Sequence, residues 1–271
     1  MTETLPNEFN VRDDFPPIDY DKWRELVDKG LAGAPFEKKL VSKTYEGLRI
    51  QPIYSSRDDS GQDDPLGFPG LASRVRGGSA LGSVQSGWDL RQEFTTPSLT
   101  DCNKEILADL NGGVTSVQIC LDNAARRGLD PDDSASDAWA GRDGVMVYCV
   151  EDLDSLLTDV QLDLISVALD SGVAFLPAAA TLIALWQRRG ISPHEASGAF
   201  NADPLAELAR EGQISTSAEN ALSLLSDLAS WTSHHYPKVT SVGVDSSPYH
   251  IGGATAAQDI ALSVATGVEY L

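Results

Sequence analysis

The stretch LISVALDSGVAFLPAAATLIALWQRRG, residues 164–190, joins a short apolar run to a long apolar helical pattern. Residues 164–169 are apolar without alternation, which indicates a strand that is buried on both faces. Residues 173–189 predict a strongly apolar helix, and Gly190 follows it as a stop signal. A strand followed by such a helix is one βα unit, and parallel sheets are built from these units.

The same rhythm continues on both sides of this unit, with a period of roughly 30 residues that is typical of βα repeats. It predicts an α/β fold of the (βα) TIM-barrel type, incomplete because about five units are visible where a full barrel needs eight. A doubly wound sheet produces the same rhythm, and periodicity alone does not separate the two. The other predicted strands are residues 114–120, 145–150, 197–200 and 239–244, and the other predicted helices are residues 101–110, 151–157, 216–231 and 254–267.

The first 100 residues are less regular. The spacing of apolar residues after Asp19 predicts a short amphipathic helix that ends near Gly30. Residues 65–87 are rich in glycine and poor in large apolar side chains, so this segment is expected to lie over other structure. We therefore predict an N-terminal arm over residues 1–100 and a partial barrel domain over residues 101–271.

Composition narrows the functional classes. Forty acidic residues against twenty basic ones give a net charge of −20, which disfavours binding to nucleic acid or to an anionic membrane surface. No apolar run approaches the ~20 residues of a membrane span, and the N-terminal residues do not resemble a signal peptide. Three cysteines without CxxC spacing indicate buried thiols. These features predict a cytoplasmic protein.

Few residues carry a recognisable chemical motif. The sequence has no P-loop and no GxGxxG between a strand and a helix. His234-His235 is better explained by a helix C-terminus than by a metal site, and the acidic run 130–133 by a solvated loop than by a cation site. Tyr249-His250 stands out because it follows the last predicted strand, where βα folds bind ligands. The alternative is a tightly packed turn.

Several segments resemble the barrel domain of the methylmalonyl-CoA mutase family, and they do so in the family's order. The small, non-catalytic subunit resembles the chain best, because GWDLRQ and the arm segment TYEGLRIQPIY are typical of it. The matching segments are YDKWRELVDKGLAG (20–33), KKLVSKTYEGLRIQPIYS (38–55), GWDLRQEF (87–94), RRGLDPDD (126–133), GVMVYCVEDLDSLL (144–157), SGAFNADPLAELAREG (197–212) and PYHIGGATAAQDIALSVATGVEYL (248–271).

The resemblance implies site residues and a cofactor. Tyr249 and His250 match the family's Tyr-His pair and are the candidate catalytic residues, and Arg91 is the candidate substrate-binding residue. The resemblance implies adenosylcobalamin for the family's complex. We expect this chain alone to bind no cofactor, because the DxHxxG motif is incomplete: Pro248 stands where the motif has Asp.

Other positions depart from the family's catalytic pattern. The stretch 78–87 has neither the Tyr nor the Arg that hold the coenzyme A tail. The position of the catalytic tyrosine falls on Glu93, and that of the arginine for the substrate carboxylate falls near Glu211, beside Arg210. Glu93 would repel an anionic acyl-CoA.

These departures favour a small-subunit-like, non-catalytic partner in a mutase that interconverts methylmalonyl-CoA and succinyl-CoA. Its expected partner is a catalytic mutase subunit or a second copy of the chain. One alternative is an active acyl-CoA mutase component whose cobalamin domain lies on another chain. Another is a small-molecule-binding βα protein unrelated to mutases.

Overall fold

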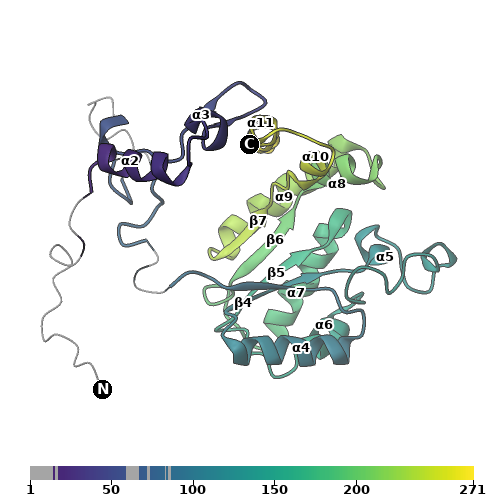
Figure 1. Cartoon of the computed structure of the whole chain (residues 1–271). Helices are drawn as coiled ribbons and strands as arrows, with labels where there is room; N and C mark the ends of the chain where they lie inside the picture. The colour runs from purple at the N-terminus through teal and green to yellow at the C-terminus, as the bar shows by residue number, and fades with distance from the viewer. Residues whose placement is uncertain (1–14, 16–17, 59–66, 72–73, 83, 85–86) are drawn as a thin grey trace, which may run out of the picture. The chain divides into compact units, whose positions relative to one another are not determined.

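The computed structural model describes residues 15, 18–58, 67–71, 74–82, 84 and 87–271. The chain forms two compact units, residues Met1–Gly82 and Ser83–Leu271. Figure 1 shows the first unit in purple and blue and the second from teal to yellow. Each unit is described separately below.

The first unit has little core of its own. It contains α2 (Tyr20–Gly30), α3 (Phe36–Lys39), the antiparallel pair β1 (Ser42–Lys43) and β2 (Arg49–Ile50), and a 3-10 turn at Ser56–Asp58. The Asp19 side chain caps α2 by accepting a hydrogen bond from the backbone N–H of Lys22 at 2.8 Å. Phe36 is the one buried apolar side chain among the described residues of this unit, and the Trp23 ring packs edge-on against it. The helix predicted after Asp19 is confirmed.

The second unit is built on a five-stranded, fully parallel sheet. The strands follow one another in chain order across the sheet (Figure 1). A doubly wound sheet reverses its strand order at a switch point, whereas sequential order is the winding of a barrel. The predicted partial barrel is therefore confirmed. The strands are β3 (Arg91–Phe94), β4 (Ser116–Cys120), β5 (Ser166–Asp170), β6 (Gly198–Ala202) and β7 (Val239–Val242).

Helices form a contiguous layer against the sheet. Within it, α4 contacts α6, α6 contacts α7, and α7 contacts α9. The register places Phe94, Ile119 and Leu169 side by side on the face that joins the core, because all three are buried. The helices of this unit are α4 (Leu99–Gly112), α5 (Asn123–Arg126), α6 (Val150–Leu156), α7 (Phe175–Arg188), α8 (Pro204–Glu211), α9 (Ala218–His235), α10 (Ser247–Ile251) and α11 (Ala256–Glu269), with 3-10 turns at Ser134–Ser136 and Gly172–Ala174.

The opposite face of the sheet carries polar side chains on β3 and β4. Alternation along each strand places Glu93, Gln118 and Ala168 together on this face, since the register pairs them. The Gln118 amide donates a hydrogen bond to the Glu93 carboxylate at 3.3 Å. In a closed barrel this face would line the interior.

One predicted strand is wrong. Residues 145–150 do not join the sheet: Val145 makes an isolated parallel bridge with Leu121, and α6 begins at Val150. The Asp152 carboxylate accepts hydrogen bonds from the backbone N–H groups of Tyr148 and Cys149, which turns the chain into α6. The run is apolar because residues such as Val145 are buried in the core, and burial alone does not distinguish a strand from a buried loop.

The first strand of the sheet lies in the segment predicted as irregular. β3 has three exposed residues followed by the buried Phe94, so it lacks the apolar run by which the other strands were predicted. Together with the division of the chain after Gly82, it places the start of the second unit earlier than the predicted boundary at residue 100.

Both edges of the sheet lack a strand partner in the part of the chain that the structure describes, since β3 and β7 are its outer members. The last helix, α11, also carries exposed apolar side chains at a spacing of four residues. These are Ile260, Val264 and Val268, at 67%, 60% and 65% exposure.

Candidate functional site

A chain of alternating charges crosses the carboxyl end of the sheet. Asp170 ends β5 and Arg126 ends α5. The Arg126 guanidinium donates to the carboxylates of Asp170 and Glu207, each at 3.0 Å. Arg126 and Glu207 are 16% and 9% exposed, so this ion pair is largely removed from water.

The chain of charges continues along α8 to the loop after β7. Arg210, one turn beyond Glu207, donates to Glu207 and to the Asp245 carboxylate, the latter at 2.6 Å. The backbone N–H of Asp245 donates to Asp203, which caps α8 and accepts a hydrogen bond from the Tyr270 hydroxyl. We call Asp170, Arg126, Glu207, Arg210 and Asp245 the strand-end network.

Electrostatics support this pairing. Burial by itself would lower the pKa of Arg126, but the carboxylates of Asp170 and Glu207 more than offset it and raise that pKa above its usual value. Burial and the hydrogen bond to Asp203 raise the pKa of Tyr270 well above its ordinary range, which keeps its hydroxyl protonated.

Two cavities open beside the network, with volumes of about 260 and 320 Å³. Four carboxylates line the smaller cavity, from Asp170, Asp203, Glu207 and Asp245, whereas Arg210 is the one arginine in its lining. The larger is lined by Arg126 and Arg127, together with Glu207 and Glu211. Carboxylates therefore outnumber or match the cations, and the network leaves none of these arginines uncompensated.

Arg91, the candidate substrate-binding residue, lies at the other end of the sheet. It begins β3, and its register partner Ser116 begins β4. Its guanidinium donates to Ser116 at 3.1 Å and to Asp89 at 3.3 Å. Burial alone would raise the pKa of Asp89, but hydrogen bonds from Ser116 and Thr115 and the charge of Arg91 lower it below its usual value.

Tyr249 and His250, the candidate catalytic pair, lie on the short helix α10 beyond the carboxyl end of β7. The structure therefore does not bring them together with Arg91. The His250 side chain is 73% exposed, and its Nδ1 lies 4.0 Å from an Asp259 oxygen. Tyr249 borders a shallow groove with Gly252 and Gly253.

Two positions that depart from the catalytic pattern are occupied by contacts within the chain. Glu93 accepts from Gln118, and Glu211 accepts from the Arg127 guanidinium. The Arg127 guanidinium also stacks 3.9 Å from the centroid of the Trp139 ring. The stretch 78–87 falls partly outside the described residues.

The strand-end network was not predicted from the sequence. Asp170 directly follows a buried strand, which is a usable signal because strand ends carry function in βα folds. Arg126 and Glu207 have no such signal, since 81 positions separate them.

Among the residues that the structure describes, no group of three or more His, Cys, Asp and Glu side chains is arranged to hold a metal ion. In the same part of the chain, no helix is long and apolar enough to span a membrane.

The fold and this site define a parallel βα protein of the barrel type whose ligand-facing end is occupied by its own ion pairs. A family model described as "Methylmalonyl-CoA mutase" matches residues 43–271, and the chain belongs to this family. The predicted resemblance is thereby confirmed.

The chain is similar to both kinds of mutase subunit. It is 34% identical to the methylmalonyl-CoA mutase small subunit of Streptomyces virginiae, over 100% of this chain and 40% of that protein. It is 28% identical to the large subunit of the same organism, over 93% of this chain and 33% of that protein. It is also 28% identical to the methylmalonyl-CoA mutase of Escherichia coli K12, over 92% of this chain and 35% of that protein. The chain thus spans two fifths or less of the length of these relatives.

Proposed function

We propose that the chain acts as part of a non-catalytic, small-subunit-like barrel beside a catalytic subunit of an adenosylcobalamin-dependent mutase. That mutase interconverts methylmalonyl-CoA and succinyl-CoA. The observation that carries the proposal is the pairing of Arg126, Arg127 and Arg210 with carboxylates of the chain itself. An acyl-CoA that bears a carboxylate and phosphates needs cations that are available to it.

Binding such a substrate here would require breaking ion pairs. Glu207 is 9% exposed, so withdrawing Arg126 or Arg210 from it would leave a buried carboxylate without full compensation. The acidic lining of the smaller cavity would also repel the substrate. Both effects support a structural role for this end of the sheet.

The cavities of the strand-end network are too small for adenosylcobalamin. Pockets for drug-sized ligands are typically ~300–1,000 Å³, and a corrin cofactor is larger than such ligands. The two cavities beside the network measure about 260 and 320 Å³, and the groove at Tyr249, at about 580 Å³, is open to solvent. The cofactor is therefore assigned to the catalytic partner, together with the radical chemistry it supplies.

A turnover assay tests the proposal. The purified chain is mixed with methylmalonyl-CoA and adenosylcobalamin, with and without a catalytic mutase subunit, and succinyl-CoA is measured by chromatography. We expect no product from the chain alone and co-purification with the catalytic subunit. Turnover by the chain plus a separate cobalamin domain, in the absence of a catalytic subunit, would contradict the proposal.

The second candidate function is an active acyl-CoA mutase component whose cobalamin domain lies on another chain. It is favoured by the position of Tyr249 beside a glycine-lined groove at the carboxyl end of the sheet. Within the described residues, the Tyr249 hydroxyl has no hydrogen-bond partner that would occupy it. In this case Tyr249→Phe and His250→Ala would lower turnover in the reconstituted system, whereas the first proposal predicts no effect on turnover.

A further inference from the structure

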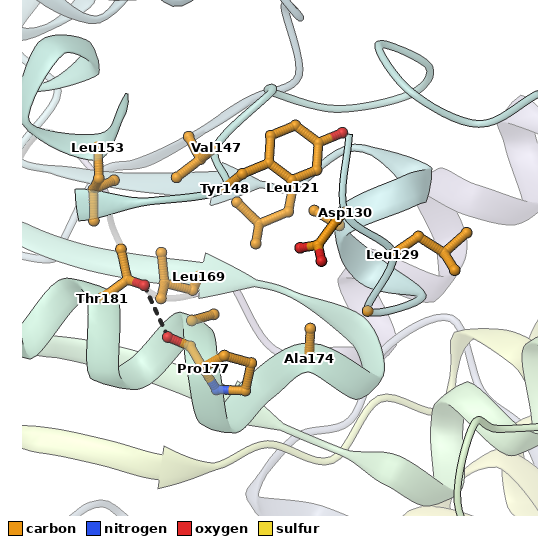
Figure 2. A pocket seen from close by; sticks show the side chains of 13 residues that line it. Leu121, Leu129, Asp130, Val147, Tyr148, Leu153, Leu169, Ala174, Pro177 and Thr181 are labelled. Atoms are coloured by element: carbon orange, nitrogen blue, oxygen red, sulfur yellow. Dashed lines mark hydrogen bonds between the residues drawn. The ribbon is translucent and has the colours of Figure 1, made fainter. Parts of the chain in front are cut away.

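A further pocket lies at the same strand ends, on the face of the sheet that the helices cover. It is a partly open pocket lined by residues at the ends of β4 and β5, by α5, α6 and α7, and by residues 128–130 and 147–148 (Figure 2). Leu169 lines it and belongs to the core-facing register of β5, whereas Asp170 in the network points to the other face. The pocket has a volume of about 150 Å³.

The walls of this pocket are apolar. Their polar atoms are already bonded within the chain: the Tyr148 hydroxyl donates to Asp122 at 2.7 Å, and the Thr181 hydroxyl donates to the Pro177 carbonyl at 2.9 Å. A closed apolar cavity of about this volume holds a benzene ring, which sets the size of the apolar group that this partly open pocket can take. The remaining lining side chains are those of Leu121, Ala125, Leu129, Val147, Leu153, Leu169, Ala174 and Ala178, with Asp130 at the rim.

The pocket is held open by a buried carboxylate. Asp122 is fully buried and accepts hydrogen bonds from the backbone N–H of Gly141 at 2.6 Å and from the Tyr148 hydroxyl. It also caps α5 through the N–H of Ala125. These bonds tie the loop that carries Tyr148 to the end of β4, so the wall is ordered before any ligand binds. Such preorganisation lowers the entropic cost of binding.

The rim of the pocket is negative. Figure 2 shows the Asp130 carboxylate between Tyr148 and Leu129, at the side of the pocket. Among the described residues this carboxylate has no hydrogen-bond or ion-pair partner, unlike the neighbouring Asp133, which caps a 3-10 turn. A ligand that fills the pocket with an apolar group would therefore gain from a cation at the rim.

We propose that this pocket binds a small organic amine: a compact aromatic or branched apolar group in the cavity, and an ammonium group against Asp130. The site is independent of the proposed mutase role. The gain from the ammonium is modest, because an exposed ion pair changes affinity about two- to fivefold. The shape of the pocket therefore selects the apolar group of the ligand, and the Asp130 carboxylate selects a positive charge on it.

Calorimetric titration at low salt tests the proposal with three probes of similar size: 2-phenylethylamine, neutral ethylbenzene and anionic 3-phenylpropionate. We expect the amine to bind tightest and the acid weakest. Asp130→Asn should remove the two- to fivefold advantage of the amine and leave ethylbenzene unchanged. The matched control Asp137→Asn, in the same acidic segment but outside the pocket, should change none of the three.

Two cavity-filling variants, Ala178→Leu and Thr181→Leu, should abolish binding of all three probes while circular dichroism shows a folded protein. Having both variants keeps the test valid if one fails to fold. Equal binding of the amine and the acid, an amine affinity that Asp130→Asn leaves unchanged, or binding that persists in a folded filled variant would overturn the proposal. The proposal would also be overturned if the folded protein did not bind the amine. That result is expected if the pocket accepts only a side chain of a partner protein.

Discussion

Replacing Arg126 with Met tests whether the strand-end network is a structural device. Arg126 bridges Asp170 and Glu207 from the end of α5, and it is 16% exposed. Met keeps an unbranched apolar stem of similar length, so the variant removes mainly the charge and its hydrogen bonds. The change leaves the Glu207 carboxylate with Arg210 as its remaining cation.

The expected loss follows from the burial of the partners. Removing one member of a buried ion pair costs ~3–5 kcal/mol of unfolding free energy. Here Glu207 keeps one cation, and Asp170 is 34% exposed, so water screens its charge. We therefore expect a loss of about 2 kcal/mol, which corresponds to a decrease in Tm of roughly 4–8 °C for a domain of this size.

Urea denaturation followed by circular dichroism measures the loss, with Arg188→Met as the matched control. Arg188 pairs with Glu151 on the surface, at 43% and 68% exposure, so its loss should lower the unfolding free energy far less. Adding Glu207→Gln to Arg126→Met should recover part of the loss, because no buried carboxylate is left short of a cation. If Arg126→Met costs no more than Arg188→Met, or if the two network changes are simply additive, the reasoning fails.

Three further outcomes are expected. The pKa of Asp89 is lowered in the folded state, so this carboxyl stabilises the protein at pH values above its ordinary pKa of 3.8, and the contribution is lost as the pH falls through the lowered value. Chemical denaturation should therefore show that Asp89→Asn is less stable than wild type at pH 7, and that the difference disappears in acid. Thiol titration with a chromogenic disulfide should label the exposed Cys149 and spare Cys120, whose pKa burial raises to about 12, until the protein unfolds. Gly198→Ala should lose several kcal/mol of unfolding free energy or fail to fold, because its Cβ would lie 2.0 Å from a backbone oxygen of β5; Gly112→Ala, with open space at the end of α4, should gain up to ~1 kcal/mol in a thermal melt.

The sequence predicts the elements that bury apolar residues and misses those that do not. The strand and helix of residues 164–190 are confirmed as β5 and α7 because their side chains fill the core. The pattern gives no signal for β3, because only its last residue, Phe94, is buried, and it predicts a strand over residues 145–150 because a buried loop has the same composition.

The candidate site was harder to predict because it depends on distant residues. Tyr249 and His250 were correctly expected beyond the last strand, but Arg91 lies at the opposite end of the sheet. The pairing of Arg126 with Glu207 depends on how two βα units are placed side by side. A single sequence, taken by itself, carries no signal for such a contact.

Sequential winding gives the sheet a modular character. Each strand pairs only with its immediate neighbours in the chain, so stability approximates a sum of unit and nearest-neighbour terms, as in a repeat protein. Opening should then proceed inward from the outermost strands, with amide protons of β5 exchanging last. Because pairing is limited to neighbouring strands, a further βα unit could pair with either outermost strand without any rearrangement of the central strands.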